Sequence, residues 1–135
     1  MASLNEYLQG RKPLGFVCLT QYFADGDFAS LFLEDVPYFA ERVDELLTLY
    51  RAMDDHRFVG CKIKGVRRIM EEMGEFEVSV YDSDKNVLLG PLVFGSMALA
   101  QSPSLEDPVE RRDRYREAKR LAKGARLKKD ELLPA

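Results

Sequence analysis

Long apolar runs are missing from this chain of 135 residues, and so are several residue types on which familiar catalytic and metal sites depend. No run approaches the roughly 20 consecutive apolar residues of a membrane-spanning helix, so the sequence predicts no membrane span. Tryptophan is absent, and His56 is the single histidine. Because a tetrahedral metal site needs several Cys or His ligands, no metal site is predicted, and catalysis has little support.

Cysteine is also scarce. Cys18 and Cys61 are the two cysteines, and neither belongs to a CxxC pair. Disulfide frameworks use more numerous cysteines, so buried reduced thiols are expected. The N-terminal residues lack the basic and apolar regions of a secretory signal, and a cytoplasmic location is therefore expected.

The net charge of −3 hides an uneven distribution. Residues 1–110 contain 10 Lys or Arg and 19 Asp or Glu, a balance of −9. Residues 111–129 contain 10 Lys or Arg and only two acids, a balance of +8. The chain therefore combines an acidic body with a basic C-terminal segment.

The first half of the chain predicts a helix, a hairpin and a longer helix. Ser3 lies three residues before Glu6, the spacing of a capping box, which predicts a short N-terminal helix. Apolar runs at 15–23 and 28–34 flank the turn sequence A-D-G-D and predict a β-hairpin. Residues 36–54 repeat apolar side chains at i, i+3, i+4 and i+7, which predicts an amphipathic helix.

The middle of the chain predicts further strands. Residues 57–63 are typical of a strand, whereas 65–73 allow two interpretations, a short helix or a continued strand, and their apolar spacing favours the helix. Runs at 76–82 and 87–94 predict a second hairpin. Pro91 cannot donate to a ladder, so the last strand is expected at an edge or a bulge.

These elements predict an α+β fold with a mostly antiparallel sheet of about five strands, built from two hairpins plus one strand and packed by the long helix 36–54. Residues 1–103 are predicted to form a single domain, and 104–135 a basic C-terminal helix or tail. If 65–73 were extended, the element order would resemble that of roadblock and longin platforms. That resemblance rests on element order alone and implies a dimerising scaffold.

The predicted strands are apolar on both faces, so the sheet needs cover on both sides. The long helix covers only one. The other face is left either to the terminal helices or to a second copy or a partner protein.

Motifs for calcium and nucleotide binding are incomplete. Residues 82–86, D-S-D-K-N, begin with calcium-loop spacing, but Val87 and Val93 occupy the positions that require Gly and Glu, so a polar turn is predicted. The segments GRKPLG and GCKIKG lack the Lys-Ser/Thr of a phosphate-binding loop. No cofactor and no small-molecule ligand is therefore predicted.

His56 follows two aspartates at the predicted end of the long helix. The helix dipole favours an imidazolium at a C-terminus, and this is the simpler interpretation. The alternative is a metal site, or a base acting with Cys61 or Cys18 as nucleophile.

Two basic groups are the candidate partner-binding sites, one near the strand 57–63 and one on the C-terminal helix. Their residues are Lys62, Lys64, Arg67, Arg68, Arg112, Arg116, Lys119, Arg120 and Lys123. Three fates compete for the basic helix: docking on the chain's own acids such as Glu41, Asp44 and Glu45, binding to nucleic acid, and binding to a membrane surface.

The leading prediction is a small cytoplasmic protein-interaction module with a scaffold or regulatory role, homodimeric and non-enzymatic. The alternative is a nucleic-acid-associated protein that uses the basic C-terminal helix and the Lys62–Arg68 cluster. A hydrolase or transferase without a recognisable motif is a third class.

Overall fold

The computed structural model describes residues 19–128 and residue 132. The N-terminal helix predicted from Ser3 and the beginning of the first predicted strand lie outside the described residues. Among those described, no helix is both long enough and apolar enough to cross a bilayer.

A five-stranded antiparallel sheet forms the centre of the molecule, in the order β1-β2-β5-β4-β3. Its strands are β1 (Leu19–Phe23), β2 (Phe28–Phe32), β3 (Tyr38–Arg42), β4 (Leu47–Ala52) and β5 (Phe58–Lys64). β1 and β2 confirm the first predicted hairpin, and β5 confirms the predicted strand at 57–63. In the turn of this hairpin, Asp27 adopts the left-handed conformation, with φ 49°.

The prediction of a long helix over 36–54 is wrong, because this stretch forms β3, a tight turn and β4. Leu47 and Leu49 are fully buried at alternate positions, which is the period of a strand. In the turn, Oδ1 of Asp44 accepts hydrogen bonds from the backbone N–H groups of Leu46 and Leu47, at 2.9 and 2.8 Å. The apolar positions of 36–54 fit the period of a helix as well as that of a strand. The pairing of β4 with β5 selects the strand.

Helix α3 (Val66–Glu75) confirms the helix favoured for 65–73. The second predicted hairpin is wrong, because only β6 (Val87–Leu88) is strand and α4 (Leu89–Leu99) follows at once. Pro91 lies in the first turn of α4, where the missing N–H removes no intrahelical bond. Residues 82–86 form the predicted polar turn, in which Oδ1 of Asp82 accepts two backbone N–H groups.

The predicted C-terminal helix is confirmed as α5 (Pro108–Ala122). Its N-cap is Asp107, whose side chain accepts the N–H of Val109 at 2.9 Å. The helix ends two residues before Gly124, which has φ 77°, and β7 (Arg126–Leu127) then pairs with β6.

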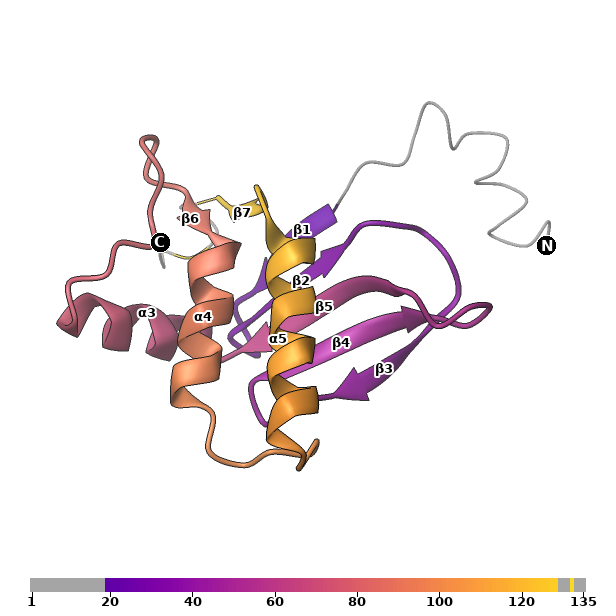
Figure 1. Cartoon of the computed structure of the whole chain (residues 1–135). Coiled ribbons are helices and arrows are strands. Elements are labelled where there is room, and N and C mark those ends of the chain that lie inside the picture. The colour runs from indigo at the N-terminus through magenta and orange to yellow at the C-terminus, as the bar shows by residue number, and fades with distance from the viewer. Residues whose placement is uncertain (1–18, 129–131, 133–135) are drawn as a thin grey trace, which may run out of the picture.

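The α+β class and the five-stranded antiparallel sheet are thus confirmed. The roadblock-like and longin-like element order does not occur in the described part, because 36–54 forms strands and 65–73 forms a helix. α4 and α5 lie side by side across one face of the sheet, and α3 lies beyond the end of β5 (Figure 1).

Docking on the chain's own acids is the fate that α5 adopts. Its residues Tyr115, Ala118 and Leu121 are buried in the core. Arg114 Nε donates to Glu41 Oε1 at 2.5 Å, and the Tyr115 hydroxyl donates to Asp44 Oδ2 at 2.5 Å. One side of α5 is therefore used by the fold, and the opposite side is left to solvent.

Glu41 should make the stability of the fold sensitive to acid. Burial raises its pKa, but hydrogen bonds from Arg114 and Arg51 outweigh burial and hold the pKa below its usual value. A carboxyl with a depressed folded-state pKa contributes stability above its unfolded pKa, about 4.3 for Glu, and that stability is lost as the pH falls through the folded pKa. Glu41→Gln is expected to lower the free energy of unfolding by about 1–2 kcal/mol at pH 7 and to flatten its decline in acid.

Urea denaturation at a series of pH values between 7 and 3 measures both effects. Glu75→Gln is the matched control, because Glu75 is exposed and has no ion pair with any described residue. That control should leave the acid limb of the stability curve as it is in the parent chain. An unchanged acid limb in Glu41→Gln would show that the two arginine contacts contribute nothing net.

Candidate functional site

Helix α4 is apolar over its whole surface, yet only part of that surface is covered. Its sequence, LGPLVFGSMAL, contains no charged side chain. Leu92 and Val93 are buried, whereas the Phe94 side chain is 57% exposed and Met97 is exposed beside it. A helix that is apolar all round is normally buried on all sides. The outer side of α4 is therefore an apolar strip that no described residue covers.

Close packing against α3 fixes the position of this strip. Gly95 lies against α3, and a Cβ atom there would stand 2.5 Å from Ile69 Cγ2 and 2.8 Å from Met73 Sδ. Glycine therefore allows the two helices to approach closely. The same contact turns the neighbouring Phe94 and Met97 away from the core.

Helix α5 supplies a row of cations beside the apolar strip. Arg112, Arg116 and Lys119 of α5 and its C-cap residue Lys123 follow one another at intervals of four, three and four residues, so they lie along one side of the helix. All four are exposed. At 1.5 Å per residue, the row extends over about 16 Å of helix.

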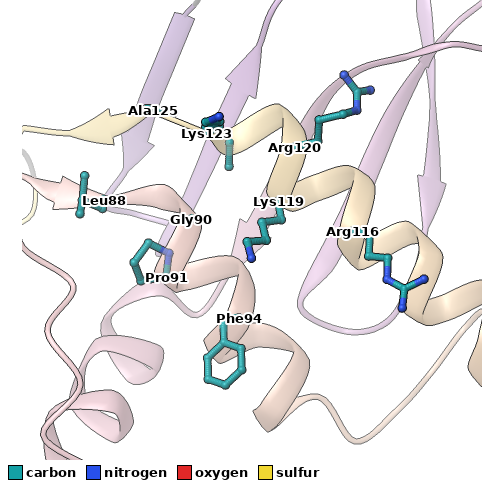
Figure 2. A pocket seen from close by; sticks show the side chains of 11 residues that line it. Leu88, Gly90, Pro91, Phe94, Arg116, Lys119, Arg120, Lys123 and Ala125 are labelled. Carbon is teal, nitrogen blue, oxygen red and sulfur yellow. The ribbon is translucent and has the colours of Figure 1, made fainter.

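A groove separates the two helices, and we call it the α4–α5 groove. Its larger part has a volume of about 710 Å³, with Pro91 and Phe94 on one side and Arg116, Lys119 and Lys123 on the other. A smaller part of about 270 Å³ continues past Phe94 to Met97 and Arg112. Figure 2 shows Lys119 extending between the helices toward α4, whereas Arg120 points away from α4.

Most of the cation row is free of ion pairs. Arg116 pairs with Asp113 at 3.3 Å, and Arg120 pairs with Glu117 at 2.7 Å. Both pairs are exposed, and exposed pairs of this kind contribute little. Arg112, Lys119 and Lys123 form no ion pair with any residue in the described ranges 19–128 and 132. Their charges are therefore available to an anionic partner.

The predicted partner-binding residues fall into separate places. The five on α5 and its C-cap lie on or beside the groove. Arg68 lies on α3 and is exposed. Lys62 and Lys64 lie on β5, with side chains on the sheet face opposite α4 and α5. Arg67 is engaged by the fold, because its guanidinium donates to the backbone carbonyl of Leu132 at 3.2 Å and its N–H to the carboxylate of Asp27. The structure therefore does not unite Lys62–Arg68 with the basic helix.

Phe94 and Met97 were not predicted from the sequence as site residues, because 87–94 was predicted to be a strand and Met97 was assigned to no element. One signal was present: residues 87–100 contain no Asp, Glu, Lys or Arg, and the strongly basic helix follows a short connection later. That contrast was the one indication in the sequence of an apolar surface beside a row of cations.

The alternative pairing of His56 with Cys61 has no geometric support, and Cys18, the other candidate, lies outside the described residues. Cys61 is buried in the core, and burial raises the pKa of its thiol to about 12. His56 lies in the turn between β4 and β5, with its ring edge-on to Phe39 at 5.3 Å between centroids. The helix terminus proposed for His56 does not exist. Within the described ranges, no three His, Cys, Asp or Glu side chains converge as metal ligands.

Comparison of the chain with protein-family models, with curated proteins and with solved structures finds no match.

Proposed function

We propose that this chain is a protein-interaction module whose α4–α5 groove binds an acidic amphipathic helix of a partner protein. The observation that carries this proposal is the pairing of an apolar wall with a cation row along the same groove. Phe94 is 57% exposed on the wall, and the cations lie along the opposite side. Amphipathic helices bind such grooves with their apolar face inward and their charges at the rim.

The apolar wall favours a protein partner over nucleic acid. A phosphate backbone would satisfy the cations but would leave Phe94 and Met97 without an apolar contact. A partner helix satisfies both, because a row of about 16 Å corresponds to about three helical turns. Acidic side chains at i, i+4, i+7 and i+11 of such a helix would match the spacing of the cations.

Binding of a designed peptide tests the proposal. The probe is a labelled 18-residue acidic amphipathic peptide, compared by fluorescence anisotropy with a scrambled peptide of the same composition. The amphipathic peptide is expected to bind more tightly, and more weakly at 200 mM than at 50 mM salt. Phe94→Ser is expected to weaken binding about 30-fold, the factor that corresponds to a hot spot of 2 kcal/mol. Charge reversal by Lys119→Glu is expected to weaken it about tenfold at low salt.

Matched controls lie outside the groove. Phe76→Ser removes an exposed ring after α3, and Lys85→Glu reverses a charge in the turn 82–86; both should bind the peptide like the parent chain. Equal affinity for the scrambled peptide would contradict the proposal. So would an affinity for oligonucleotides that Lys119→Glu abolishes and Phe94→Ser leaves intact, because the cation row would then serve nucleic acid.

A further inference from the structure

The sheet face opposite α4 and α5 has a surface of different chemistry from the groove. Cross-strand partners share a face, so the register places Phe23 with Phe28 and both Phe32 and Tyr50 with Gly60. We call this side of the sheet the open face, because its outer rings Phe23 and Tyr38 are 41% and 48% exposed.

Aromatic rings form two clusters on the open face. Phe32 and Tyr50 stack above Gly60 with centroids 4.7 Å apart, and Tyr38 lies edge-on to Tyr50 at 5.0 Å. Nearer β1, Phe23 and Phe28 stack at 4.7 Å. Rings thus occur on four of the five strands of the sheet, β1 to β4.

The charged residues that the strands place on this face are all positive. Arg42, Lys62 and Lys64 are its charged strand residues, and the Lys62 ammonium lies 4.4 Å above the Phe28 ring. Glu41 is the single acid within the five strands, and Arg114 of α5 holds it on the other side of the sheet. The strands therefore give the open face three cations and no acid, although the chain has a net charge of −3.

This charge pattern argues against a second copy of the chain as the occupant. Two open faces brought together would place like charges against each other, which costs free energy. A complementary partner is anionic and has planar groups that stack on rings.

We propose that the open face binds single-stranded nucleic acid. Single strands bind to surfaces that combine cations for the phosphates with aromatic rings for the bases, whereas a duplex hides its bases from such rings. Five strands at about 4.8 Å spacing make a face about 19 Å across, comparable to sheets that stack two or three bases. This site uses none of the groove residues, so it stands independently of the proposed function.

Titration of labelled single-stranded and duplex oligonucleotides with the full chain tests the site. Single strands are expected to bind more tightly than duplexes, with a slope of log K against log salt of about −2 for three phosphate contacts. Phe23→Leu and Tyr38→Leu keep apolar area but remove the ring, and each is expected to weaken binding about tenfold. Lys62→Gln should reduce the salt slope by about 0.7.

Controls separate this site from the groove. Phe76→Leu removes an exposed ring elsewhere and should bind like the parent chain, and Phe94→Ser should lose the acidic peptide but keep the oligonucleotide. Equal affinity for duplex, equal loss in Phe76→Leu, or no binding at 20 mM salt would each overturn the proposal. Loss of binding in Lys119→Glu with full binding in Phe23→Leu and Tyr38→Leu would also overturn it and move the nucleic-acid site to α5.

Discussion

Asp44→Ala is expected to lower the free energy of unfolding by about 3–5 kcal/mol, because it leaves three buried donors without an acceptor. Asp44 is 1% exposed. Its Oδ1 accepts the N–H groups of Leu46 and Leu47, and its Oδ2 accepts the Tyr115 hydroxyl at 2.5 Å. Urea denaturation at pH 7 measures the loss.

Two further variants measure how much of this loss comes from the hydrogen bond between Asp44 and Tyr115. Burial and the hydrogen bond to Asp44 raise the pKa of Tyr115, so its hydroxyl stays protonated and remains a donor. Tyr115→Phe removes this donor alone and is expected to cost about 1.5–3 kcal/mol, the range for a hydrogen bond to a charged group. Because the two residues share one bond, the double variant should cost less than the sum of the single variants. Strict additivity would mean that this bond does not couple α5 to the turn.

The Asp44–Tyr115 bond also links the fold to the candidate site. It anchors the buried side of α5 to the turn between β3 and β4, while the opposite side of α5 presents the cation row. Loosening the anchor should therefore weaken binding of the acidic peptide, even though neither residue belongs to the cation row.

Elements with strong local signals were predictable from the sequence. The turn sequence A-D-G-D defines the first hairpin, and Asp107-Pro108 marks the start of α5. The basic residues of this region could be recognised as a group because 111–129 contains 10 Lys or Arg and only two acids.

Elements that depend on distant contacts were not predictable. In 36–54 the apolar residues satisfy the helical period and the strand period together, and only pairing with β5 and the Asp44 turn select the strands. In 87–94 a charge-free run has no periodicity, so its helix and the exposed Phe94 were missed. Lys62 and Lys64 were named as candidate residues from the sequence, but their aromatic surroundings depend on the order of the strands.

Gly60→Ala is expected to lower the free energy of unfolding by about 3 kcal/mol, at the upper end of the range for overpacking. A Cβ atom at Gly60 would stand 2.3 Å from the Leu31 carbonyl oxygen and 3.2 Å from Phe32 Cδ1. The Leu31 carbonyl oxygen belongs to the backbone of the neighbouring strand β2. The clash can therefore be relieved only if β2 and β5 move apart where they pair.

Gly74→Ala is the matched control, because a Cβ atom at Gly74 in α3 meets nothing within 4 Å. Alanine there should raise the free energy of unfolding by about 0.5–1 kcal/mol through better helix propensity. Urea denaturation of both variants measures the contrast. Opposite signs from the same chemical change would show that the close approach of β2 and β5 sets the cost at Gly60. A Gly60→Ala chain as stable as its parent would mean that β2 and β5 do not approach so closely beneath Phe32.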